Sequence, residues 1–139
     1  MRLKEMDLAE AATILIAVGD GVLADSLRFS LELEGFEVKL CDEYSLPHAM
    51  AAEDAPGCLV LDHDVFLRMV DGKSELPFAA SGIPVVLMVG HKTERVLARA
   101  QQAGVTMVVE KPLLGGVLFE AIRSALKGRQ PSHPAQRPS

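Results

Sequence analysis

Short apolar runs recur along the chain, most of them followed by a polar turn and a segment with helical spacing. The first run, residues 12–18, reads Ala-Thr-Ile-Leu-Ile-Ala-Val, which is typical of a strand covered on both faces. Residues 36–40 instead alternate apolar and charged side chains, which predicts an edge strand with one solvated side. Three more strands are predicted at residues 58–61, 83–88 and 105–109.

Helical spacing follows most of these runs. Leu23, Leu27 and Leu31 are four residues apart, with Asp20 as an N-terminal cap and Gly35 placed to end the helix in a left-handed conformation. Further helices are predicted at residues 47–53, 93–103 and 117–127, the last two ending at glycine.

Strands that alternate with helices predict an α/β fold with an open parallel sheet and helices on both faces. We expect this domain to occupy residues 12–128. Residues 1–11 are expected to form an N-terminal arm. Residues 129–139 hold three prolines and no apolar pattern, which predicts a disordered tail.

The charge and length of the chain narrow the function. Its 139 residues are enough for one domain, and a net charge of −5 disfavours nucleic acids and anionic membranes as partners. No apolar run reaches the roughly 18 residues of a transmembrane helix, and the start lacks a signal-peptide pattern, so we expect a cytoplasmic protein. Cys41 and Cys58 lie beside apolar runs and are interpreted as structural thiols.

Candidate chemistry lies where the predicted strands end, because ligands of open parallel sheets bind beyond the carboxyl ends of the strands. Asp20 follows the first strand, Asp62 and Asp64 follow the third, and Lys111 follows the fifth. An aspartate and a lysine that meet at one edge suit an acyl-phosphate site, with Asp62 as nucleophile and Lys111 as a point charge on the transferred group.

In these residues the sequence resembles the response-regulator receiver domains of two-component signalling. The resemblance covers about residues 12–127 and is carried by Cys-Leu-Val-Leu-Asp at 58–62, Ile-Pro-Val-Val-Leu-Met at 83–88 and Glu-Lys-Pro at 110–112. It implies a flavodoxin-like five-stranded sheet in the order 2-1-3-4-5. It also implies that Asp62 is the phosphoacceptor position and Lys111 the phosphate-contacting lysine.

The sequence departs from the receiver pattern at the metal site. The acidic pair that follows the first strand in this family falls on Val18 and Gly19, which leaves Asp20 and Asp64 as a residual acidic pocket. Mg²⁺ requires oxygen ligands in near-octahedral geometry, so its binding should be impaired. We expect Mg²⁺ as a cofactor only if phosphorylation is retained.

Two further positions depart from the same pattern. Val89 stands where the family has a hydroxyl residue, and Val108 stands where it has a switch aromatic. The sequence therefore predicts a stand-alone, atypical receiver that is not an enzyme and acts by protein–protein interaction. Its partner is expected to be a histidine kinase, another receiver or an output protein, with homodimerisation as a further possibility. The resemblance points to the surface of the last two helices.

Three alternatives remain open at this point. A conventional receiver would be phosphorylated on Asp62 by a histidine kinase. The Asp62-x-Asp64 pattern also matches small phosphohydrolases, in which the first carboxylate attacks and the second acts as acid and base. A metal site formed by His63, His91 and a carboxylate is the third.

Overall fold

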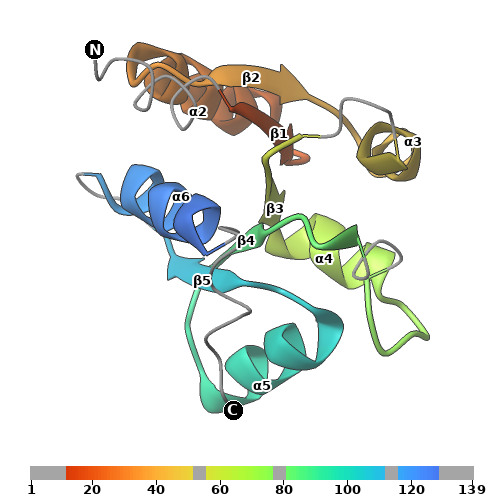
Figure 1. Ribbon diagram of the computed structural model, residues 1–139. Helices are drawn as coiled ribbons and strands as arrows, with labels where there is room; N and C mark the ends of the chain where they lie inside the picture. Colours follow the sequence, from red (N-terminus) through yellow and green to blue (C-terminus); the bar gives the residue numbers. More distant parts are fainter. Residues whose placement is uncertain (1–11, 52–55, 77–80, 112–115, 129–139) are drawn as a thin grey trace.

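Strands and helices alternate along the whole described part of the chain. The computed structural model describes residues 12–51, 56–76, 81–111 and 116–128 (Figure 1). The elements in chain order are β1 (Thr13–Ala17), α2 (Gly21–Leu33), β2 (Glu37–Leu40), α3 (Leu46–Ala51), β3 (Cys58–Asp62), α4 (His63–Met69), β4 (Val85–Val89), α5 (Glu94–Ala103), β5 (Met107–Glu110) and α6 (Val117–Lys127). The predicted arm at 1–11 and tail at 129–139 lie outside the described residues.

The strands form one parallel sheet in the order β2-β1-β3-β4-β5. The chain steps over β1 only once, on its way from β2 to β3, and afterwards adds each strand beside the one before it. This confirms the predicted flavodoxin-like α/β class. At one edge, β2 buries only Val38 and exposes Glu37 and Lys39, which confirms the predicted edge strand.

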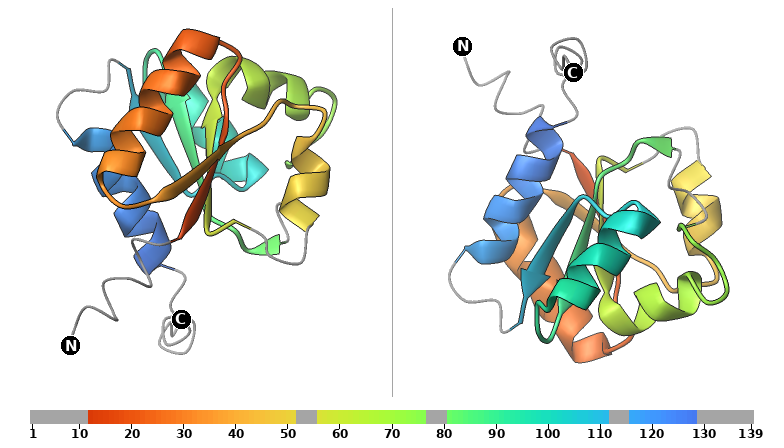
Figure 2. Two further views of the ribbon diagram at one scale, coloured as in Figure 1. Left: turned by 90° about the horizontal axis from the view of Figure 1, so that it is seen from above. Right: turned by 90° about the horizontal axis from the view of Figure 1, so that it is seen from below.

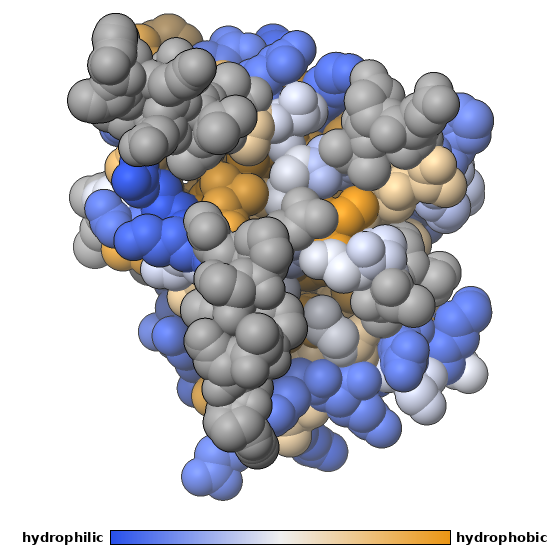
Figure 3. Space-filling model, in the orientation of Figure 1, coloured by the Kyte–Doolittle hydropathy of each residue, from blue (hydrophilic) through white to orange (hydrophobic). Residues whose placement is uncertain are grey.

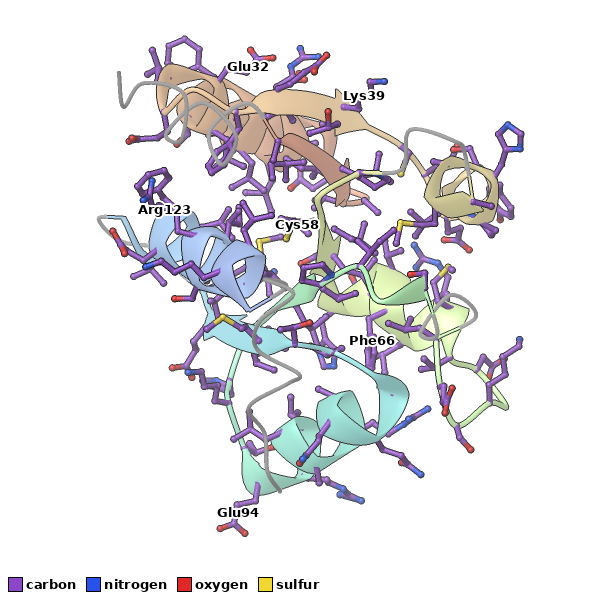
Figure 4. All side chains as sticks on the ribbon, viewed as in Figure 1. Glu32, Lys39, Cys58, Phe66, Glu94 and Arg123 are labelled. Atoms are coloured by element: carbon purple, nitrogen blue, oxygen red, sulfur yellow. The ribbon has the colours of Figure 1, made fainter. Side chains whose placement is uncertain are left out.

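Helices cover both faces of the sheet. Figure 2 shows α2 and α6 together on one face, with α3, α4 and α5 on the other. The central strand β3 serves both halves of the core: Leu59 and Leu61 pack towards α3, α4 and α5, whereas Cys58 and Val60 pack towards α2 and α6. Cys58 and the buried Phe66 of α4 accordingly lie on opposite sides of the sheet (Figure 4). Each fully buried aliphatic side chain contributes about 1.5–3 kcal/mol of transfer free energy.

Capping residues set the ends of two long helices; the caps at Asp20, Gly35 and Gly104 are as predicted, whereas Thr93 is a cap and not the first helical residue. The side chain of Asp20 caps α2, and Gly35 follows this helix with a φ of 102°. The hydroxyl of Thr93 accepts a hydrogen bond from the backbone N–H of Val96 at the start of α5, and Gly104 ends that helix with a φ of 98°. A left-handed residue at this position is least strained as glycine.

No bounds were predicted from the sequence for a helix directly after the third strand. Helix α4 begins at His63 and buries Val65, Phe66 and Met69. Its bounds were missed because it is only seven residues long and no side chain caps its first turn.

Two strands start two residues later than predicted, and the other three differ from their predicted bounds by one residue at one or both ends. The fourth strand is β4 (Val85–Val89) instead of residues 83–88, because Pro84 has no N–H and joins the sheet only as an acceptor from the N–H of Leu59. The fifth strand starts at Met107 instead of residue 105, because Gly104 ends α5 and the side-chain oxygen of Thr106 accepts a hydrogen bond from the N–H of Val85.

Hydrophilic and apolar residues share the face of the molecule that Figure 3 shows. On the face shown in Figure 3, hydrophilic residues predominate and apolar residues appear in small patches between them. Within the described part of the chain, no helix is long and apolar enough to cross a lipid bilayer.

Candidate functional site at the carboxyl edge of the sheet

The site forms where β3, β4 and β5 end side by side. Asp62 is the last residue of β3 and pairs in register with Met88 of β4. Lys111 directly follows β5, and its N–H donates a hydrogen bond of 2.8 Å to the carbonyl oxygen of Val89. Because parallel strands end at a common edge, two residues 49 positions apart are brought together.

Asp62 and Lys111 form a direct ion pair. The ammonium nitrogen of Lys111 lies 3.0 Å from Oδ1 of Asp62. The Asp62 side chain is only 11% exposed and the Lys111 side chain 36% exposed. Asp62 is the one polar or charged side chain in the buried set of the described residues. A carboxylate this deeply placed requires a partner, and Lys111 supplies both the opposite charge and a hydrogen bond.

Asp20 lies at the same edge of the sheet, but its carboxylate serves helix α2. Its Oδ1 accepts hydrogen bonds from the backbone N–H groups of Val22, at 3.0 Å, and Leu23, at 3.2 Å. Exposed Asp64 lies in the first turn of α4, where a carboxylate favours the positive end of the helix dipole. Each residual acidic residue therefore has a local structural role.

These carboxylates do not fit a magnesium site. Among the described residues, no group of three or more histidine, cysteine, aspartate or glutamate side chains is arranged to hold a metal ion. Oδ1 of Asp20 caps a helix and Oδ1 of Asp62 faces an ammonium group, so one oxygen of each carboxylate is already engaged. Among the described residues, His63, His91 and a carboxylate do not form a metal-binding group either.

Apolar side chains occupy the positions at which the receiver pattern has polar or aromatic ones. Val89 is fully buried and Val108 is half-buried, and both pack in the half of the core that α3, α4 and α5 cover. Val18 is half-buried against the other half, next to exposed Gly19. Their assignment as replaced pocket and switch positions stays a prediction.

The remaining candidates from the sequence make contacts other than the ion pair. His63 stacks on Phe66, with ring centroids 6.2 Å apart, and exposed His91 faces Glu110 at 3.9 Å. Cys58 is fully buried. Burial, followed by the nearby charge of Asp42, raises the pKa of the Cys41 thiol from 9.0 to about 11. Such a thiol is a poor nucleophile at neutral pH, in keeping with the structural role predicted for it.

One structural residue of α5 was missed by sequence reasoning. Arg99 of α5 donates hydrogen bonds to the carbonyl oxygens of Ser74, Val70 and Lys73, which end α4 and begin the following loop. A single arginine thereby satisfies three backbone acceptors at the end of α4 and in the loop that follows it. The sequence carries no signal for this contact, because it depends on the tertiary arrangement of α4 and α5.

Several known proteins with a similar sequence are response regulators. The chain is 30% identical over 127 residues to the transcriptional regulatory protein FixJ of Bradyrhizobium diazoefficiens, covering 86% of this chain and 58% of that protein. It is 28% identical over 120 residues to the C4-dicarboxylate transport regulator DctD of Pseudomonas aeruginosa, covering 84% of this chain and 26% of that protein. The chain thus spans about a quarter to just over half of the length of these relatives.

Solved structures agree on the fold. A CheY-like response regulator receiver domain from Methanospirillum hungatei superposes with a TM-score of 0.71 at 19% identity, covering 86% of this chain and 96% of that one. Full-length FixJ from B. japonicum gives 0.68 at 24% identity, covering 89% and 62%. No family model matches the sequence. The fold, the pairing of Asp62 with Lys111 and the relatives together place the chain in the receiver-domain family of response regulators, which serves two-component signalling.

Proposed function

We propose that this receiver domain is atypical: it signals by protein–protein contact, and its magnesium-dependent phosphorylation is impaired. The observation that carries the proposal is the 3.0 Å ion pair between Lys111 and Asp62. In this reading the ammonium group takes the place of a metal ion beside the carboxylate. The pair holds one standing conformation, and the domain presents a constant surface to its partner.

Two features of the pocket support the impairment. Phosphoryl transfer to a carboxylate develops negative charge that a bound metal ion normally stabilises, and the described carboxylates are not grouped to hold one. Val89 has no hydroxyl to offer a phosphoryl oxygen. A hydrogen bond to a charged group contributes about 1.5–3 kcal/mol, so its absence further disfavours an acyl phosphate.

The proposed partner is a histidine kinase, another receiver or an output protein in the cytoplasm, with no catalytic activity assigned to this domain. The candidate docking surface is that of α5 and α6, where Leu97 is 41% and Val117 is 43% exposed. A partner that covers these apolar side chains would remove them from water, which favours association. If this surface forms a homodimer, gel filtration at high concentration should give twice the monomer mass, and a monomeric profile would count against homodimerisation.

The direct test is incubation with acetyl phosphate and Mg²⁺, followed by intact-mass analysis of the wild type and of Asp62→Asn. We expect no phosphate-sized mass increase in either protein while circular dichroism shows an intact fold. An increase confined to the wild type would contradict the proposal. A conventional receiver labelled in parallel controls for the phosphodonor.

The second candidate is a conventional receiver that a histidine kinase phosphorylates on Asp62. One observation favours it: the carboxylate and the lysine both lie at the carboxyl edge of the sheet, where a phosphoryl group would be bound. It predicts magnesium-dependent labelling of Asp62. The phosphohydrolase alternative predicts turnover of phosphate esters that is lost in Asp62→Asn, and its assay needs only the same two proteins.

A further inference from the structure

A cavity of about 360 Å³ lies between helices α2 and α6, on the face of the sheet that these two helices cover. This volume is in the range of small-molecule sites. The described residues that line the cavity are Leu23, Ser26, Leu27, Ser30, Leu31 and Glu34 from α2, Gly116, Leu118 and Phe119 at the start of α6, and Lys111. Of these ten residues, five are leucine or phenylalanine, four are polar or charged and one is glycine, so the lining is amphiphilic.

The apolar wall on the α6 side is held in place from two directions. The ring of Phe119 packs against Phe36, with centroids 5.7 Å apart. The guanidinium of Arg123, labelled on α6 in Figure 4, lies 5.5 Å from the centroid of the Phe119 ring. A wall fixed before the ligand arrives lowers the entropy cost of binding.

The two charged lining residues come from opposite ends of the layer that α2 forms. Lys111 follows β5, at the carboxyl edge of the sheet where α2 also begins. Glu34 is the residue at which α2 ends, 13 residues of helix later. At 1.5 Å per residue the helix spans about 20 Å, so the lysine end is electrostatically distinct from the glutamate end. Lys111 is the one cation among the described lining residues.

We propose that this cavity binds a small amphiphilic carboxylate, such as a medium-chain fatty acid. The carboxylate accepts a charge-assisted hydrogen bond from the ammonium group of Lys111, and the hydrocarbon chain packs against Leu27 and Phe119. Uncharged Ser26 and Ser30 line the open side of α2, where they solvate the ligand without opposing its charge.

The ligand would compete with Asp62 for the same lysine. Lys111 lines the cavity and also carries the ion pair, and its flexible four-carbon stem lets the ammonium group turn from one carboxylate to the other. Ligand binding then releases Asp62 and changes the carboxyl edge of the sheet. This coupling rests on the proposed function, whereas binding itself does not.

The test is a titration of the ¹⁵N-labelled domain with sodium octanoate, followed by amide chemical shifts. We expect shifts centred on Leu23, Ser30 and Phe119, and clearly weaker binding of 1-octanol, which has the same chain without the charge. Ser30→Trp fills the cavity and should abolish the shifts. Ser124→Trp, at an exposed serine of α6 that does not line the cavity, should leave them unchanged.

The role of the charge is tested with the double variant Lys111→Met/Asp62→Asn, which removes both members of the ion pair and leaves no unpaired buried carboxylate. We expect octanoate to bind at least about tenfold more weakly, which corresponds to about 1.4 kcal/mol. The proposal is overturned if octanoate does not bind at millimolar concentration, if Ser30→Trp still binds it, or if octanol binds equally well. Acetyl phosphate labelling tests the proposed function separately, so the two failures are distinguishable.

Discussion

Replacing Lys111 with methionine tests whether the ion pair with Asp62 holds the edge of the sheet. Methionine keeps most of the length and apolar stem of lysine but removes its charge. The Asp62 side chain, only 11% exposed, then loses its ammonium partner. We expect the free energy of unfolding to fall.

The size of this loss follows from the geometry of the pair. At 3.0 Å and an effective dielectric constant of about 20, the Coulomb attraction is about 5.5 kcal/mol, most of which offsets the desolvation of the two groups. Breaking a fully buried pair costs about 3–5 kcal/mol, and an exposed pair contributes about 0–1 kcal/mol. One partner here is buried and the other is about one-third exposed, so the expected loss is about 2 kcal/mol.

Urea unfolding at neutral pH measures this loss. Lys39→Met on exposed β2 is the matched control and should change stability by less than about 0.5 kcal/mol. Adding Asp62→Asn to Lys111→Met should recover about 1 kcal/mol or more, because the unpaired carboxylate is gone. A Lys111→Met domain as stable as the control, or a double variant without recovery, would refute the standing ion pair.

Three further predictions concern single residues. Asp20→Ala should lower the free energy of unfolding by about 1 kcal/mol, whereas Asp20→Asn should retain it, because asparagine also caps helices. Thermal unfolding measures both variants, and an equal loss of stability in the two would show that the charge matters more than the cap. Arg99→Ala should cost about 1–3 kcal/mol in urea unfolding because three carbonyl oxygens lose their donor, whereas exposed Arg95→Ala should be nearly neutral. The pKa of the Cys41 thiol is raised from 9.0 to about 11 in the folded state, so the unfolded chain loses this proton first as the pH rises. The free energy of unfolding should therefore fall between pH 9 and 11, and it should fall less in Cys41→Ala.

The sequence was most informative where local physics decides the structure. The apolar runs predict the strands, and Asp20, Thr93 and Gly104 mark helix ends through backbone hydrogen bonds that depend only on neighbouring residues. The bounds of helix α4 were missed because it is short and its stability comes from burial of Val65 and Phe66, which is a tertiary effect.

The candidate site was predicted in part. Asp62 and Lys111 could be placed at one edge from the parallel topology alone, but their direct contact depends on side-chain geometry. The cavity between α2 and α6 could not be predicted, because it results from the spacing of two helices that are more than 80 residues apart in the sequence.

The alternation along β3 has a consequence for how such a site can diverge between related proteins. Leu59 and Leu61 face one set of helices and Val60 faces the other. Deletion of one residue within β3 would turn the side chains that precede it to the opposite face, or would draw Asp62 away from the carboxyl edge of the sheet. The length of this strand is therefore constrained by the packing of the whole domain. Exposed Gly19, in contrast, has no atom within 4 Å of the place where a Cβ atom would be added. A residue with a side chain can therefore replace Gly19 without repacking of its neighbours. A domain built in this way can lose or regain a reactive pocket by a few substitutions while its fold stays the same.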